Sequence, residues 1–143
     1  GNPYHCHDNK GGHGTQTLQQ AISNSCNPAF IQIGQLIGAN IFSKYFKAFG
    51  LMGKTGIDLP GEASPYYHSE ENMGPTELAS SSFGQTFNIT PIQMITLAST
   101  AVNGGYLVTP HVVERIIDEE KNVVKTPILI TGSRLYLKQH LLL

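Results

Sequence analysis

The chain has 143 residues, a net charge of -1 at pH 7, and 13% charged against 40% hydrophobic residues. This length suits one domain with a buried core, and the near-zero net charge gives no electrostatic reason to expect nucleic acid as a partner. No apolar run is long enough to span a membrane, and the polar, glycine-rich first residues do not resemble a signal peptide. An export signal or membrane anchor is therefore expected outside these residues, if the protein has one.

The first predicted elements are two helices that meet at a proline. Apolar spacing indicates a helix over residues 15–24, and Thr17 with Gln20 forms a capping-box pattern. Pro28 excludes helical geometry at the residue before it and suits the first position of a new helix. Asn27 is therefore predicted to be the N-cap of the second helix.

Glycines are predicted to end the second and third helices. The second helix, over residues 28–37, stops at Gly38, and a third begins after Asn40 and stops at Gly50. The third helix carries an aromatic-rich stripe that we expect to pack in a core. This stripe consists of Ile41, Phe42, Tyr45, Phe46 and Phe49.

The second half of the chain begins with a long loop, because glycine and proline recur from residue 50 to residue 75. A short helix is predicted to open at Pro75. Thr90 followed by Pro91 signals a longer helix with a clear apolar period that ends at Val102. Two β-rich stretches then flank a polar turn and predict a hairpin. They cover residues 106–117 and 123–124, with the turn at 118–122, and the tail from Thr126 to Leu143 has no clear pattern.

These elements predict a mainly α fold with a small β hairpin, in the α+β class. Amphipathic helices need a partner layer, and this chain has too little strand to supply one. The sequence therefore predicts a piece of a larger domain, whose apolar helix faces are exposed or paired between copies of the fragment.

Two groups of side chains raise the question of a metal site or a disulfide. The residue types of a zinc site occur near the start of the chain, but adjacent residues rarely converge on one ion, and a mobile polar end is the favoured interpretation. No metal and no cofactor are therefore predicted. Cys6 and Cys26 are able to pair in an oxidising compartment, but the sequence does not give their distance. The metal candidates are His5, Cys6, His7, Asp8 and His13.

The letters Gly53-Lys54-Thr55 resemble the end of a phosphate-binding loop. That motif needs a glycine five residues earlier, where the chain has Ala48, and it needs a helix to follow. A helix precedes the motif instead, and glycine and proline follow it. The sequence therefore excludes this nucleotide-binding interpretation.

Ser25-Cys26-Asn27 lies at the predicted break between the first two helices. A hydroxyl at Ser25 can relay a proton, and the Asn27 amide can both donate and accept hydrogen bonds. The tripeptide alone is common, however, and Asn27 on its own is explained by helix capping.

The longer context resembles the transpeptidase domain of class B penicillin-binding proteins, of the Gram-positive sporulation and elongation types. Three stretches carry the resemblance in order, from about Gly12 to Lys125. They are HGTQTLQQAISNSCNPAFIQIGQLIG, GLMGKTGIDLPGE and GPTELASSSFGQTFNITPIQMITLASTAVNGGYLVTPHVV. The resemblance implies a fragment of that domain over residues 1–125, without most of the central sheet, and an atypical tail over 126–143 that we expect to be non-native.

Enzymes of this family use three motifs: Ser-x-x-Lys for the nucleophile, Ser-x-Asn for proton transfer and substrate binding, and Lys-Thr-Gly on a strand. The resemblance gives Ser25 and Asn27 the second role. The chain has no Ser-x-x-Lys, and Lys54-Thr55-Gly56 is predicted to be a turn in a loop, with Asp58 as a local cap. The resemblance therefore implies that the parent enzyme cross-links peptidoglycan stem peptides by serine acyl transfer, and the missing nucleophile motif predicts that this chain alone is inactive.

The resemblance also implies the surroundings of the parent protein. Its expected ligands are peptidoglycan stem peptides and β-lactams, and its expected place is outside the cytoplasm, held by a membrane anchor beyond this chain. The alternative hypothesis is a non-catalytic helical interaction module, which requires the resemblance to be accidental. A Ser-x-x-Lys motif upstream and a Lys-Thr-Gly strand downstream in the gene would discriminate the two.

Overall fold

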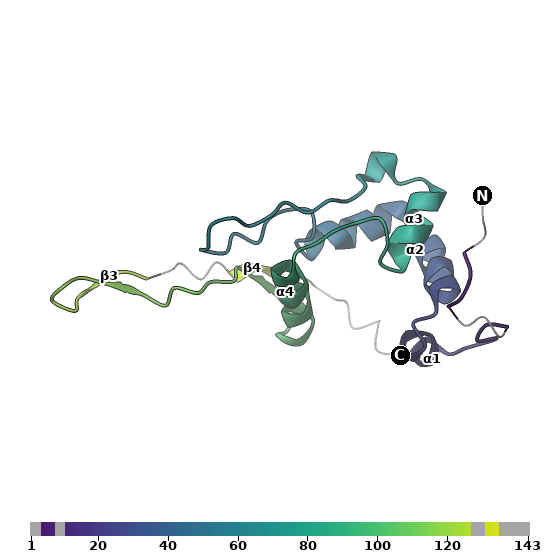
Figure 1. Cartoon of the computed structure of the whole chain (residues 1–143), viewed down its shortest axis with the longest axis horizontal. Helices are drawn as coiled ribbons and strands as arrows, with labels where there is room; N and C mark the ends of the chain where they lie inside the picture. The colour runs from purple at the N-terminus through teal and green to yellow at the C-terminus, as the bar shows by residue number, and fades with distance from the viewer. Residues whose placement is uncertain (1–3, 8–10, 127–130, 135–143) are drawn as a thin grey trace. The chain divides into compact units, whose positions relative to one another are not determined.

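The computed structural model describes residues 4–7, 11–126 and 131–134, the last four for their backbone alone. It is mainly helical with two small antiparallel ribbons, which confirms the predicted α+β class (Figure 1). No helix of the described part is both long and apolar enough to cross a membrane. The elements are α1 (Leu18–Ser23), α2 (Asn27–Ala48), the 3-10 helix η1 (Glu70–Asn72), α3 (Pro75–Ser82), α4 (Pro91–Val102), β1 (Tyr106–Val108), β2 (Ile116–Ile117), β3 (Val123–Lys125) and β4 (Thr131–Arg134).

The chain divides into two units. The first comprises residues 1–44 and 67–87, and the second comprises residues 45–66 and 88–143. The boundary passes through α2, so that most of this helix belongs to the first unit and its last turn to the second.

The start of the first unit follows the capping signals of the sequence. Thr17 caps α1, and its side chain and that of Gln20 form the predicted reciprocal box. The prediction for Asn27 is wrong: it is the first helical residue of α2, and the carbonyl of Cys26 accepts the first hydrogen bond of this helix from Phe30. The side chain of Asn27 is therefore not needed as a cap.

Gly38 interrupts α2 as the sequence predicts, although the helix continues beyond it. Its φ of 78° and ψ of 161° are not helical, so the two predicted helices are joined across a kink. A residue with a side chain would be strained at this positive φ, which explains why glycine stands there.

Helix α3 packs on α2 through a small-residue contact within the first unit. A Cβ atom placed on Gly34 would lie 1.8 Å from Oγ of Ser82, so only glycine permits this approach. Leu78 and Ala79 of α3 are buried, 7% and 5% exposed. These contacts are part of the core of the first unit.

The second unit begins where α2 ends. The Gly50 amide donates to the carbonyl of Lys47, and the Leu51 amide donates to that of Phe46, which together make a Schellman motif with Gly50 at φ 75°. Phe46 and Leu51 are both buried. The predicted stop at Gly50 is confirmed.

The aromatic stripe is only partly in a core. Phe46 is 8% exposed, whereas Ile41 and Tyr45 are 46% and 40% exposed. The expectation that the whole stripe packs inside is therefore wrong, because the described residues supply too few neighbours to cover it.

Thr90 caps helix α4, as the sequence predicts, and the structure adds a reciprocal capping box between Thr90 and Gln93. Its fully buried residues, however, are polar, whereas several of its apolar residues are exposed. This is the exposure expected for a helix whose partner layer is missing. The buried residues are Gln93, Thr96 and Thr100, and the exposed apolar residues include Met94, Ile95 and Val102.

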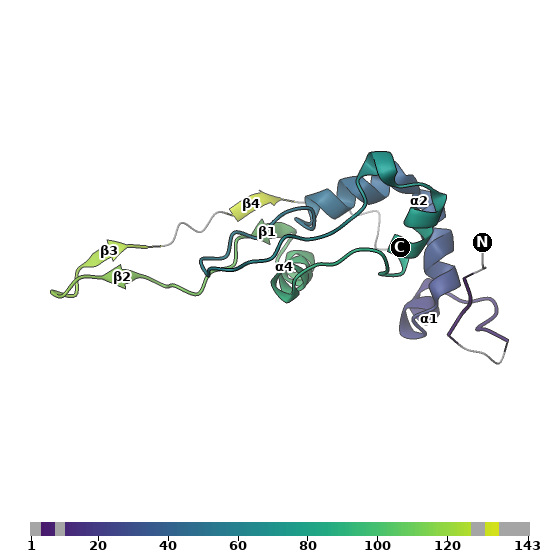
Figure 2. The same ribbon diagram turned by 45° about the horizontal axis from the view of Figure 1, so that its top comes forward.

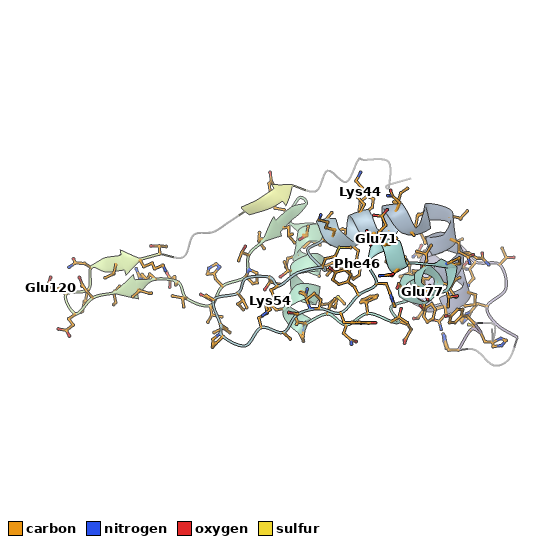
Figure 3. The ribbon with its side chains drawn as sticks, turned by 90° about the horizontal axis from the view of Figure 1, so that it is seen from above. Lys44, Phe46, Lys54, Glu71, Glu77 and Glu120 are labelled. Atoms are coloured by element: carbon orange, nitrogen blue, oxygen red, sulfur yellow. The ribbon has the colours of Figure 1, made fainter. Side chains whose placement is uncertain are left out.

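Two ribbons complete the second unit. Strands β2 and β3 form the predicted hairpin, with Glu120 in its polar turn (Figure 3). The Asp118 carboxylate accepts a hydrogen bond from the Asn122 amide at 2.7 Å, which closes this turn. Strand β1 pairs instead with β4, within the tail for which no pattern was found (Figure 2). The expectation that residues 126–143 are non-native stays a prediction, and most of them lie outside the described residues.

Candidate functional site

Ser25 occupies a strained backbone position at the end of α1. Its amide donates to the carbonyl of Ile22, and the Cys26 amide donates to that of Ala21. This is a Schellman motif in which Ser25 takes the left-handed place, at φ 46°, that glycine ordinarily fills. A side chain held in this region costs on the order of 1 kcal/mol, and such strain is typical of functional positions.

The three residues of Ser25-Cys26-Asn27 face alternately outward and inward. Ser25 is exposed, Cys26 is 5% exposed, and Asn27 is half-buried at the start of α2. Cys26 lies next to buried Ala21, as the Schellman motif places these two residues in contact. Within the described part of the chain, neither the Ser25 hydroxyl nor the Asn27 amide has a hydrogen-bond partner. Both groups are therefore available to a bound molecule.

Lys54-Thr55-Gly56 lies in an irregular loop that Glu62 holds in place. The carboxylate of Glu62 accepts hydrogen bonds from the backbone amide and hydroxyl of Thr55, both at 2.7 Å, and from the Gly56 amide at 3.1 Å. Gly56 and Gly61 have φ values of 77° and 85°. These glycines serve the backbone geometry of the loop, as predicted, but the structure assigns no turn to residues 54–56.

Electrostatics in this loop follow from the same hydrogen bonds. Burial raises the pKa of Glu62, but the donors on Thr55 and Gly56 outweigh it, and the pKa lies below its usual value. Asp58 accepts from the Val112 and Val113 amides at 2.8 Å each, and these bonds lower its pKa. The prediction of a local cap at Asp58 is wrong: the residue joins the loop to a segment 54 positions further along.

A small cavity of about 110 Å³ lies in the second unit. Lys54, labelled in Figure 3, is the charged residue of its lining. Ser25 and Asn27 belong to the first unit, so they are not part of this cavity. The other lining residues are Phe49, Gly50, Thr55, Gln93, Thr96, Leu107, Val108 and Thr109.

A cluster of sulfur and imidazole groups lies beside Cys26. Sγ of Cys6 is 3.0 Å from Nδ1 of His13, and these two atoms and Sγ of Cys26 all lie within 4.8 Å of one another. Both thiols are free. Cys6 and His13 were predicted as candidate metal ligands, whereas Cys26 was considered only as a disulfide partner of Cys6, because no local spacing links it to the histidine. The glycines between Cys6 and His13 were the available signal, since they permit a tight reversal.

Of the other early candidates, His7 lies beside this cluster, and His5 does not belong to it. The rings of His7 and His13 are 5.3 Å apart. His5 is exposed, and Asp8 lies outside the described residues.

Comparison with known proteins identifies the family. Residues 1–134 match the model of the penicillin binding protein transpeptidase domain. The chain is 46% identical over 109 residues to stage V sporulation protein D of Bacillus subtilis, and 32% identical over 117 residues to the peptidoglycan D,D-transpeptidase PbpA of Mycolicibacterium smegmatis. These alignments cover 76% and 78% of this chain but only 17% and 23% of the relatives.

Solved structures agree with the family match. Penicillin-binding protein A of Mycobacterium tuberculosis, as a ceftriaxone acyl-enzyme complex, superposes with a TM-score of 0.74 at 26% identity, over 85% of this chain and 27% of that one. Penicillin binding protein 3 of the same organism, complexed with aztreonam, shares the fold at a TM-score of 0.73 and 22% identity, over 78% of this chain and 25% of that one. The chain therefore belongs to the penicillin binding protein transpeptidase domain family.

Proposed function

We propose that this chain is the Ser-x-Asn part of a penicillin-binding D,D-transpeptidase that cross-links peptidoglycan stem peptides. The observation that carries the proposal is the corner at Ser25, where a strained left-handed serine stays exposed between two helices. Family membership supplies the chemistry: a serine attacks the stem-peptide carbonyl, a terminal residue leaves, and an amine of a second strand takes the acyl group. The same proposal places the transpeptidase domain outside the cytoplasm, where a membrane anchor in another part of the parent protein holds it.

In this proposal, Ser25 and Asn27 have distinct roles. The Ser25 hydroxyl passes a proton toward the departing amine and accepts one from the incoming amine. The Asn27 amide hydrogen-bonds the peptide part of the substrate, which orients the reacting carbonyl. Burial of the intervening Cys26 supports this division, because it holds the two polar residues on the outer side of the corner.

The chain by itself is expected to be inactive. It contains no Ser-x-x-Lys motif, and its Lys-Thr-Gly letters lie in an irregular loop rather than in a strand. The purified 143-residue chain should therefore form no covalent adduct with a fluorescent penicillin, as measured by gel fluorescence and intact mass. A stoichiometric adduct would overturn the assignment of a missing nucleophile.

The role of the corner is tested in the longer protein that carries both missing motifs. Ser25→Ala should lower the rate of peptide cross-linking by about 100-fold or more, the typical contribution of a positioned proton-transfer group. Asn27→Ala should weaken acylation by β-lactams as well as cross-linking. Ser23→Ala is the matched control, because Ser23 is an exposed serine at the end of α1. Equal activity of the Ser25 and Ser23 variants would contradict the proposal.

Replacement of Ser25 by glycine separates strain from chemistry. Glycine suits a φ of 46°, so Ser25→Gly should raise the free energy of unfolding while it lowers the cross-linking rate. If Ser25→Gly lowers both the free energy of unfolding and the cross-linking rate, Ser25 serves folding alone.

A further inference from the structure

We propose that Cys6, His13 and Cys26 form a zinc site that fastens the start of the chain to the Ser-x-Asn corner. The sequence predicts no metal here, but the structure brings together three ligands from separate positions. Each of the three donor atoms lies within 4.8 Å of the other two. Two thiols and one imidazole are the ligand types that zinc prefers.

The distances suit a metal with only small adjustments. Bonds of about 2.3 Å to sulfur and about 2.0 Å to nitrogen place tetrahedral ligand atoms roughly 3.5 to 3.8 Å apart. The observed Cys6–His13 contact of 3.0 Å would open slightly, and Sγ of Cys26 already lies within 4.8 Å of both atoms. His13 presents Nδ1 to Cys6, so its proton belongs on Nε2 when a metal is bound. These three donors fill three of the four tetrahedral positions.

The backbone around the site is arranged for this convergence. Gly11, Gly12 and Gly14 have φ values of 114°, 74° and 60°, and they turn the chain so that His13 comes back to Cys6. The glycine-rich start of the chain, which was predicted to be a mobile polar end, is therefore explained by a loop that these glycines build. Tyr4 also stacks edge-on against Phe83 with ring centroids 5.4 Å apart, which holds the segment from a second point.

The position of Cys26 gives the metal a consequence for the proposed active site. Cys26 is buried between Ser25 and Asn27, and its own amide closes the turn that holds Ser25 in the left-handed region. A bond from its sulfur to zinc would fix this turn at its centre. Zinc is then a structural clamp that positions Ser25 and Asn27, without itself touching the substrate.

A disulfide between Cys6 and Cys26 is the competing explanation of the cluster. It would use the same two sulfur atoms but would not need His13. The imidazole therefore decides between the two: a zinc site depends on His13, and a disulfide does not.

The test uses the 143-residue chain, reduced and freed of metal with a chelator. Zinc is titrated in competition with a chromophoric chelator, and cobalt replaces zinc as a spectroscopic probe. We expect one ion per chain, thiolate-to-cobalt charge transfer, and tetrahedral d–d bands. Cys6→Ser, His13→Ala and Cys26→Ser should each weaken zinc binding by about 100-fold or more. His111→Ala is the matched control, since this exposed histidine lies in the other unit.

A rescue variant guards against loss of folding. His13→Cys supplies a third thiolate at the same place, so it should retain zinc binding and strengthen the charge-transfer band relative to the wild type. The proposal is overturned by a wild-type chain that binds no zinc, by wild-type affinity in His13→Ala, or by binding to His13→Cys no stronger than to His13→Ala. No β-lactam enters the measurement, so its outcome is independent of the proposed transpeptidase function.

Discussion

Helices α3 and α4 both begin at a proline, yet α3 buries a large apolar side chain whereas α4 leaves large apolar side chains exposed. Helix α3 buries Leu78 at 7% exposure against its own unit, whereas α4 leaves Ile95 at 61% and Val102 at 86% exposure. The face that α4 does bury is lined by glutamine and threonine, whose polar atoms are hydrogen-bonded within the unit. Helix α3 therefore packs against a partner within this chain. We infer that the apolar face of α4 packs on a layer supplied by the rest of the transpeptidase domain.

The largest expected effect comes from truncating the same kind of side chain in the two helices. Leu78→Ala should lower the free energy of unfolding by about 2–4 kcal/mol, because it opens a cavity under α3. Val102→Ala should change it by less than about 0.5 kcal/mol, because its side chain is already in water. Chemical denaturation monitored by circular dichroism measures both. Similar losses of unfolding free energy in the two variants would contradict the difference in packing between α3 and α4.

The α2–α3 contact gives the next effect. Gly34→Ala should destabilise the first unit by about 1–2 kcal/mol, since its new methyl group would overlap the Ser82 side chain and the overpacking outweighs the better helix propensity of alanine. Gly53→Ala is the control, because a Cβ there meets nothing within 4 Å. Adding Ser82→Gly to Gly34→Ala should restore the room and recover part of the loss.

The polar face of α4 is tested at Gln93. Its side chain is 1% exposed, accepts from the Thr90 amide at 2.8 Å and donates to the Gly53 carbonyl at 2.7 Å. Gln93→Leu should cost about 1–3 kcal/mol, because it leaves both partners unpaired. Gln35→Leu, at an exposed position of α2, is the matched control. An unchanged midpoint in the Gln93 variant would show that this face is not part of the core.

A smaller effect should appear in the pH dependence of the second unit. The pKa of Asp58 is lowered in the folded chain, so its contribution to stability is complete above the unfolded value of about 3.9 and is lost as the pH falls through the folded value. The stability difference between wild type and Asp58→Asn should therefore be constant at neutral pH and shrink below about pH 4. Thermal melts across this range measure it, and a difference that grows on acidification has the wrong sign.

The smallest effect on folding, and a distinct effect on association, is expected at the exposed face of α4. Ile95→Glu and Val102→Glu should leave the unfolding midpoint almost unchanged, since neither side chain is buried. They should reduce self-association of the fragment, measured by light scattering, because they place charge on its apolar surface. Unchanged association would locate the self-contact elsewhere.

The sequence by itself determined the features that depend on neighbouring residues. The capping box at Thr17, the helix cap at Thr90, the stop at Gly50 and the polar turn of the hairpin all follow from hydrogen bonds between residues a few positions apart. Local signals therefore predicted them correctly. Ser25 and Asn27 were chosen as candidate site residues through resemblance rather than through spacing alone, and their role stays a prediction.

Only the tertiary structure decided the contacts between distant residues. It joined Asp58 to the backbone 54 residues away, placed Cys26 beside Cys6 and His13, and turned the apolar face of α4 outward. The left-handed φ of Ser25 likewise emerged only from the structure, because a serine gives no local signal for a position that glycine prefers. Such features depend on which surfaces meet in space, and residue order constrains that only weakly.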